Sequence, residues 1–81
     1  MTTRDWIGPK EIGRVLEVTD RLGLHREGVR VPLDTEGKGR VSVENGKLVV
    51  VAPQEGDFDA FVAALEAAIR ATPGVERVKR I

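Results

Sequence analysis

The sequence predicts a single α+β domain, residues 1–81, in which two helices cover one face of a small, antiparallel-dominated sheet. Two segments carry apolar residues at helical spacing, and between them an Asn-Gly pair separates two stretches of alternating apolar and polar residues. The chain has 81 residues, which suffices for one domain with a modest core.

The first predicted helix covers residues 9–22. Pro9 suits the first helical position, Glu11 places an acid in the first turn, and Gly23 is a natural stop. One face carries Ile12, Val15, Leu16, Thr19 and Leu22. A strand through residues 14–18 is the alternative, because β-branched residues are frequent there.

Residues 28–52 predict a three-stranded antiparallel meander. Pro32 has no N–H to donate to a ladder, which indicates an edge strand, and residues 34–39 form a polar, glycine-rich connection. Asn45-Gly46 predicts a two-residue hairpin turn and thereby sets the register of the flanking strands. This register assigns Val41, Val43, Leu48 and Val50 to the core face, and Arg40, Ser42, Val49 and Val51 to the other face.

The second predicted helix covers residues 58–72, capped by Asp57 and ended by Pro73-Gly74. Val75 to Ile81 is then predicted as a last strand, at a sheet edge or as a partly exposed tail. The expected core anchors of this helix are Phe58, Phe61, Leu65 and Ile69.

If Thr3 to Ile7 forms an opening strand, the element order approaches the βαββαβ of a ferredoxin-like domain. The segment Ala-Ile-Arg-Ala-Thr-Pro-Gly-Val-Glu-Arg-Val, residues 68–78, resembles the helix–Pro-Gly-Val–strand closure of small regulatory ferredoxin-like domains such as ACT-type ligand-sensing domains. The glycine-rich ligand loop that ACT domains carry after their first strand is not evident, so the resemblance implies no functional residue.

Composition narrows the classes of function. The formal net charge is zero, which argues against a dedicated binder of nucleic acid or anionic membranes. The absence of cysteine excludes disulfides and thiolate metal sites. The sequence has no long apolar run and no signal-peptide pattern, so we expect a soluble, cytoplasmic protein. It also has no Walker-type phosphate loop and no Gly-x-Gly-x-x-Gly motif, and we expect no cofactor. Abundant charge with one Asn and one Gln fits a thermophilic source or a GC-rich codon bias equally well.

Three segments of the chain contain residue types that serve as catalytic bases, anion ligands or metal ligands in other proteins. His25 is the only histidine, and Asp20 or Glu27 would have to orient it as a base; a surface loop histidine is the favoured interpretation. Lys38 and Arg40, interleaved with glycines, form either an anion-binding loop or a plain connection. The acids Glu55, Asp57 and Asp59 are better explained by helix capping than by a metal site.

Two groups of cations suggest a further function. They would form one patch if the junction after the first helix lies beside the C-terminus, although acids dilute both groups. The residues are Arg21, Arg26 and Arg30 in the first group, and Arg77, Lys79 and Arg80 in the second.

The sequence features that say most about function indicate self-association. Val49 and Val51, with Pro32 nearby, are expected to leave an apolar patch on the helix-free sheet face, unless Arg30, Arg40 and Lys47 cover it with their stems. The second helix carries a separate alanine stripe, which favours either close approach of another element or helix formation alone. The stripe is Ala60, Ala64, Ala67 and Ala71.

We therefore expect a non-enzymatic, self-associating accessory or regulatory protein that forms a homodimer. An additional, unknown protein partner stays open. The alternative is a small module that binds anions or nucleic acid through the two groups of cations.

Overall fold

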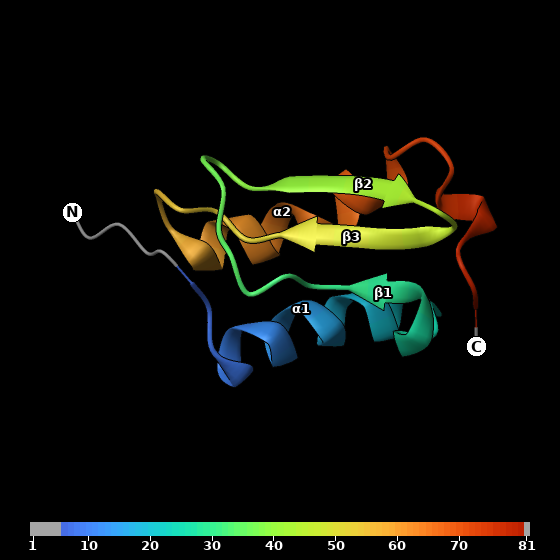
Figure 1. The fold of residues 1–81 in the computed structure, drawn as a ribbon, viewed down its shortest axis with the longest axis horizontal. Coiled ribbons are helices and arrows are strands. Elements are labelled where there is room, and N and C mark those ends of the chain that lie inside the picture. The colour runs from blue at the N-terminus through green and yellow to red at the C-terminus, as the bar shows by residue number, and fades with distance from the viewer. Residues whose placement is uncertain (1–5, 81) are drawn as a thin grey trace.

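The computed structural model describes residues 6–80 and places a three-stranded sheet in front of α2, with α1 running along its lower edge (Figure 1). The helices are α1, Pro9–Arg21, and α2, Phe58–Arg70; the strands are β1, Val29–Arg30, β2, Arg40–Glu44, and β3, Lys47–Val51. Short 3₁₀ helices, η1 (Arg26–Gly28) and η2 (Val75–Arg77), follow α1 and α2 along the chain. The predicted α+β class is confirmed.

Both helices form where apolar spacing predicts them, and residues 14–18 are helical rather than extended. At the start of α1 the Gly8 N–H donates to Glu11 Oε2 at 3.1 Å, which satisfies a backbone donor that the helix itself cannot pair. The Asp57 carboxylate accepts from the Asp59 N–H at 2.9 Å and caps α2 in the same way.

The predicted antiparallel meander is wrong, because the strand order is β1–β3–β2 and the sheet is mixed. β3 pairs antiparallel with β2 and parallel with β1. Every residue from Leu48 to Ala52 is buried, which suits the central position in a sheet. The chain between β1 and β2 therefore crosses to the far side of β3, and it is held there by the hydrogen bond from Glu36 N to Ala52 O at 3.0 Å.

The Asn45-Gly46 hairpin is confirmed, with φ values of 54° and 76°. Its register is the predicted one: Glu44 lies opposite Lys47, and Val41 lies opposite Val50. Since side chains alternate along a strand, the predicted division of β2 and β3 into two faces holds.

The predicted C-terminal strand is wrong. Val75–Arg77 is a 3₁₀ turn, and the only strand-like pairing of the described part of the last segment is an isolated bridge between Arg80 and Leu24. Val75 and Val78 are three residues apart, so a helical turn brings both toward the core, whereas a strand would direct them to opposite faces.

The ferredoxin-like arrangement is not confirmed. Its proposed opening strand falls largely on residues 3–5, which lie outside the described part of the chain. Trp6 makes one antiparallel bridge with Asp34, and the Ile7 N–H donates to Leu33 O at 2.9 Å, so this segment borders the sheet at an edge.

One core lies between the helices and the sheet. Phe58, Leu65 and Ile69 anchor α2 as predicted, but Phe61 is only half-buried because it lies at the side of the core, beside Gly39. Within residues 6–80, neither helix has the length and apolarity needed to cross a membrane. The buried cluster consists of Ile7, Val15, Val18, Leu24, Leu48, Val50, Ala52, Phe58, Leu65, Ile69 and Val78.

Gly39 and Gly46 both have positive φ values, but their surroundings differ. A Cβ at Gly39 would lie 2.6 Å from Phe61 Cε1, whereas a Cβ at Gly46 would meet nothing within 4 Å. We therefore expect Gly46→Ala to lower the free energy of unfolding by about 1 kcal/mol through backbone strain alone. Gly39→Ala should cost roughly 1–3 kcal/mol more because of the added overlap. Urea unfolding of both variants measures the difference, and equal losses would contradict the close approach of Phe61 to Gly39.

Candidate functional site

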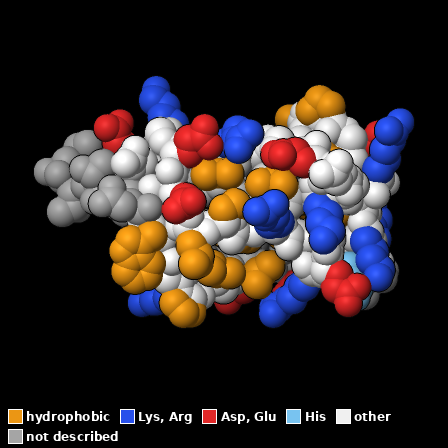
Figure 2. Space-filling model, in the orientation of Figure 1, with side chains coloured by type: hydrophobic (Ala, Val, Ile, Leu, Met, Phe, Trp, Pro, Cys, Tyr) orange, Lys and Arg blue, Asp and Glu red, His pale blue; other side chains and the backbone are white. Residues whose placement is uncertain are grey.

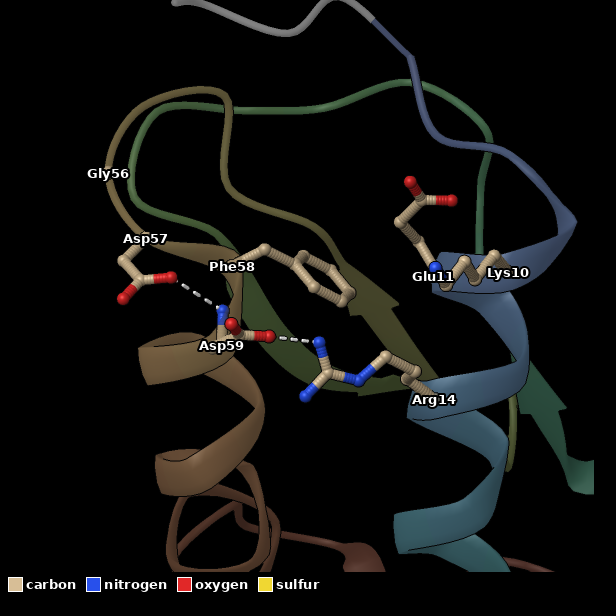
Figure 3. A pocket seen from close by; sticks show the side chains of 7 residues that line it. All are labelled: Lys10, Glu11, Arg14, Gly56, Asp57, Phe58 and Asp59. Atoms are coloured by element: carbon tan, nitrogen blue, oxygen red, sulfur yellow. Dashed lines mark hydrogen bonds and ion pairs between the residues drawn. The ribbon is translucent and has the colours of Figure 1, made fainter. Parts of the chain in front are cut away.

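A cleft of about 400 Å³ lies between the N-terminal ends of α1 and α2 (Figure 3). Arg14 reaches from α1 to Asp59 on α2 and forms an ion pair with it. The Arg14 guanidinium also lies 5.5 Å from the centre of the Phe58 ring, so a single side chain ties the two helices together. The cleft is lined by Lys10, Glu11, Arg14, Gly56, Asp57, Phe58 and Asp59.

The three carboxylates that line this cleft have partners within the fold. The carboxylates of Glu11 and Asp57 accept hydrogen bonds from the helix starts, and Asp59 takes the Arg14 charge. Of the three acids considered for a metal, Asp57 and Asp59 have these other partners, and Glu55 is exposed and does not line the cleft. Among residues 6–80 no group of three His, Cys, Asp or Glu side chains is placed to hold a metal ion.

The two segments that carry the predicted groups of cations lie side by side, although Arg80 lines a different hollow from Arg30 and Lys79. The bridge between Leu24 and Arg80, and the hydrogen bond from His25 N to Lys79 O at 2.9 Å, join the junction after α1 to the C-terminal segment. Figure 2 shows Lys and Arg side chains gathered at the end of the molecule that carries the β2–β3 turn. Two of the cations are nevertheless paired with acids: Arg26 with Asp20 at 2.8 Å, and Lys79 with Glu27 at 3.0 Å.

An open hollow of about 490 Å³ at this end is bounded by Lys47, Lys79 and Glu27. The hydrogen bond from Lys79, reinforced by the charges of Lys79, His25 and Lys47, holds the pKa of Glu27 below its ordinary value. A second hollow beside it contains Arg30 and again Lys47. The prediction from sequence missed Lys47 as a member of this patch, although its place directly after the Asn-Gly turn indicates exposure at a strand end.

His25 has a structural position. Its Nδ1 accepts a hydrogen bond from the Glu27 N–H at 3.0 Å, so the ring caps the short helix η1. This bond occupies the ring nitrogen that a carboxylate would orient in a general base.

The loop containing Lys38 and Arg40 is tied into the fold as a connection. Its Gly39 N–H donates to Glu36 O, and its Gly37 carbonyl accepts from Gln54 N at 2.9 Å. Arg40 lies 3.5 Å from a Glu36 oxygen. One of the amides that an anion would use is therefore committed to the backbone of the loop.

Val49 and Val51 lie on the helix-free sheet face, as predicted, but they are 6% and 5% exposed rather than open to solvent. Arg30 and Ser42 flank Val49 in the same row across the sheet, and polar side chains of this kind cover neighbouring apolar ones. Pro32 is half-buried. Among residues 6–80 the large apolar side chains that remain exposed are Trp6 at 68% and Leu33 at 59%. Whether the valines mediate association stays a prediction.

The outer edge of β2 presents a regular row of backbone N–H and C=O groups without a hydrogen-bond partner in the sheet. Because Glu44 and Lys47 close a two-residue turn, the ladder to β3 uses the N–H and C=O groups of Arg40, Ser42 and Glu44. The corresponding groups of Val41 and Val43 point away from β3. Within residues 6–80 no backbone group pairs with them.

Comparisons with protein-family models, curated proteins and solved structures find no match for this chain.

The two ion pairs at the cationic end should make stability sensitive to acid. The hydrogen bond from Arg26 lowers the pKa of Asp20 from its ordinary 3.8, and the pKa of Glu27 is lowered from 4.5. Folding therefore favours the ionised carboxylates; their contribution is fully present above about pH 5 and is lost as the pH falls through the folded-state pKa values. We expect Asp20→Asn combined with Glu27→Gln to flatten the decline in unfolding free energy between about pH 5 and pH 3.

Urea unfolding at several pH values measures this slope. Glu17→Gln is the matched control, because Glu17 is exposed on α1 and has no ion pair within the described residues. The same slope in the double variant and the unmodified chain would contradict the assignment.

Proposed function

We propose that this chain is a non-enzymatic accessory or regulatory domain that acts by self-association. The observation that carries the proposal is the outer edge of β2, where the N–H and C=O groups of Val41 and Val43 have no backbone partner within residues 6–80. An edge of this kind is a template for pairing with another strand.

The two edges of the sheet differ in how they are protected. β1 has only two residues and is followed closely by Pro32, which cannot donate to a ladder. β2 has five residues, without proline, glycine or bulge. Folded proteins protect edges by shortening them, interrupting them or covering them. Short length and a nearby proline occur at β1 and not at β2, which supports association at β2; the turn at Gly74 lies beside the Val43 side chain, near one end of that strand.

A non-enzymatic function is supported by the places that hydroxyl and imidazole groups take in the fold. The Thr19 and Thr72 hydroxyls donate to the carbonyls of Leu16 and Ala68, and His25 accepts a backbone N–H. Ser42 donates to Glu44 on an exposed strand surface. None of these four groups forms a nucleophile–base pair with another, which is the arrangement that nucleophilic catalysis requires.

Sedimentation equilibrium of the unmodified chain, from micromolar to millimolar concentration, tests the proposal. We expect the mean mass to rise with concentration from the monomer value of 8.8 kDa toward twice that value. Added salt should change the association less than it changes a purely charge-driven contact, because backbone hydrogen bonds are its main component. A mass of 8.8 kDa at every concentration would refute self-association.

Anion or nucleic-acid binding is the second candidate, and it is favoured by the convergence of the junction and the C-terminal segment at one end. Arg30 and Lys47 line the same hollow there, and neither has an ion pair within the described residues. Phosphate groups bind to such clusters through charge, so affinity would fall as salt rises.

A fluorescent single-stranded oligonucleotide titrated at low and high salt tests this candidate. If the hollow binds phosphate, Arg30→Ala with Lys47→Ala should weaken binding at least tenfold at low salt and reduce its salt dependence. Lys38→Ala is the matched control, because Lys38 precedes the start of β2, at the end of the strands opposite the Asn45-Gly46 turn. Binding that is absent, or that all three substitutions weaken alike, would exclude a specific site.

A further inference from the structure

The β2 strand has a charge pattern that complements its own reverse. Its sequence is Arg-Val-Ser-Val-Glu, with Ser42 at the centre and opposite charges at the two ends. When two copies of such a strand run antiparallel about a two-fold axis at Ser42, each Arg40 lies opposite Glu44 of the second copy. Opposite charges that face each other across strands are stabilising, and like charges are destabilising.

We propose that two copies of this chain join their β2 strands in this register and form one continuous six-stranded sheet. The proposal rests on the self-association proposed above and adds to it a surface, a register and a symmetry. Closed two-fold pairing is the commonest symmetry of soluble oligomers.

Backbone hydrogen bonding selects the same register as the charges. The outward-facing groups belong to Val41 and Val43, which lie at equal distances along the strand from Ser42. With the axis at Ser42, Val41 of one copy and Val43 of the other form a hydrogen-bonded pair, and the symmetric pair repeats it. The outward N–H and C=O groups of both copies are then satisfied. A shift by one residue would place these groups out of phase and bring core-facing side chains opposite surface ones.

The charged ends of β2 are available for this pairing. Arg40 and Glu44 are 52% and 53% exposed. Within one copy Arg40 lies 3.5 Å from a Glu36 oxygen and 3.9 Å from a Glu44 oxygen, and Ser42 donates to Glu44 at 3.0 Å; all of these contacts lie at the surface. Their side chains lie on the same face as Ser42, so they would meet the second copy on the helix-free side of the enlarged sheet. Parallel pairing in register would instead bring Arg40 against Arg40.

The helix behind the edge presents a surface that permits the approach of a second copy. Asp59 contacts α1 through Arg14, so it marks the side of α2 that faces α1. At 3.6 residues per turn, Ala64 and Ala68 lie on the opposite side of the helix. Both are exposed, and Phe61, on the same side, lies beside Gly39 at the start of β2.

Pairing at β2 would therefore bring two α2 helices side by side through alanines. Small side chains allow the helices to approach while the strands keep their ordinary spacing of about 4.8 Å. The sheet edge and the helix face are independent features, and both point to a second copy.

A single introduced cysteine tests the register directly, because the chain has no cysteine of its own. Ser42 would face Ser42 of the second copy as a non-hydrogen-bonded pair, with a Cα–Cα separation of about 4.5 Å. This separation lies within the range that a disulfide bridges. We expect Ser42→Cys to form a covalent dimer rapidly under mild oxidation.

Leu33→Cys is the matched control, since Leu33 is 59% exposed but lies away from β2, beside the first described residues of the chain. It should cross-link at least tenfold more slowly. Equal rates for the two variants, or a faster rate for Leu33→Cys, would overturn the proposed register.

Charge exchange provides a second, independent readout. Arg40→Glu and Glu44→Arg each place like charges opposite one another in their own homodimers, so each should weaken association about tenfold. An equimolar mixture of the two variants should associate more tightly than either alone. In the mixed dimer one chain carries acids at positions 40 and 44 and the other carries arginines at both, so every facing pair is of opposite charge. Arg30→Glu, on the same sheet face at the opposite edge, should leave association unchanged.

The outcomes separate this inference from the proposed function. A monomer at every concentration refutes both. A dimer that none of the charge exchanges weakens, and that Ser42→Cys does not trap, refutes pairing at β2 and leaves self-association standing. Recovery of affinity in the mixture of variants is expected only if Arg40 and Glu44 meet across the interface.

Discussion

Burial of β3 from Leu48 to Val51 is the constraint on which the other contacts depend. Leu48 and Val50 face the helices with no exposed surface, while Val49 and Val51 are almost as buried on the opposite face. A strand buried in this way needs a hydrogen-bonding neighbour on each side, because unpaired backbone groups away from water are costly. β2 supplies one neighbour through the hairpin, and β1 supplies the other.

The position of β3 also determines the course of the chain before β2. Residues 31–39 must pass from one side of β3 to the other, and the hydrogen bonds to Ala52 and from Gln54 attach this crossing to the end of the central strand. Gly39 is needed there because its φ is 88° and Phe61 leaves no room for a Cβ. The ring of Phe61 thereby links α2 to the start of β2.

Features that depend on neighbours in sequence were predictable. Helical spacing located α1 and α2 to within two residues, and the Asn45-Gly46 turn fixed the register between β2 and β3. The pairing of β1 was not predictable from the turn residues, because β1 and its partner β3 are separated in the chain by the 31–39 connection and by β2. A signal was present nonetheless: residues 48–52 are uniformly apolar, which is typical of a central strand, whereas residues 40–44 alternate as an edge strand does.

The candidate sites also divide into features that neighbouring residues determine and features that distant contacts determine. The sequence names most of the cations at the hairpin end, but their partners depend on distant contacts, such as the ion pair between Glu27 and Lys79. The premise that Val49 and Val51 are exposed was wrong, because the residues that flank them belong to two different neighbouring strands.

A local turn and the proposed assembly are connected through the alternation of backbone groups. Since the Asn45-Gly46 turn makes Glu44 and Lys47 a hydrogen-bonded pair, it also decides that Val41 and Val43, rather than Arg40, Ser42 and Glu44, direct their N–H and C=O groups outward. The outward groups are therefore symmetric about Ser42, which is also the centre of the charge pattern. If the turn were displaced by one residue, Arg40, Ser42 and Glu44 would direct their N–H and C=O groups outward instead, and Ser42 would face its copy as a hydrogen-bonded pair. The charges of Arg40 and Glu44 place the two-fold axis at Ser42, and the turn determines that Val41 and Val43 form the backbone hydrogen bonds across it.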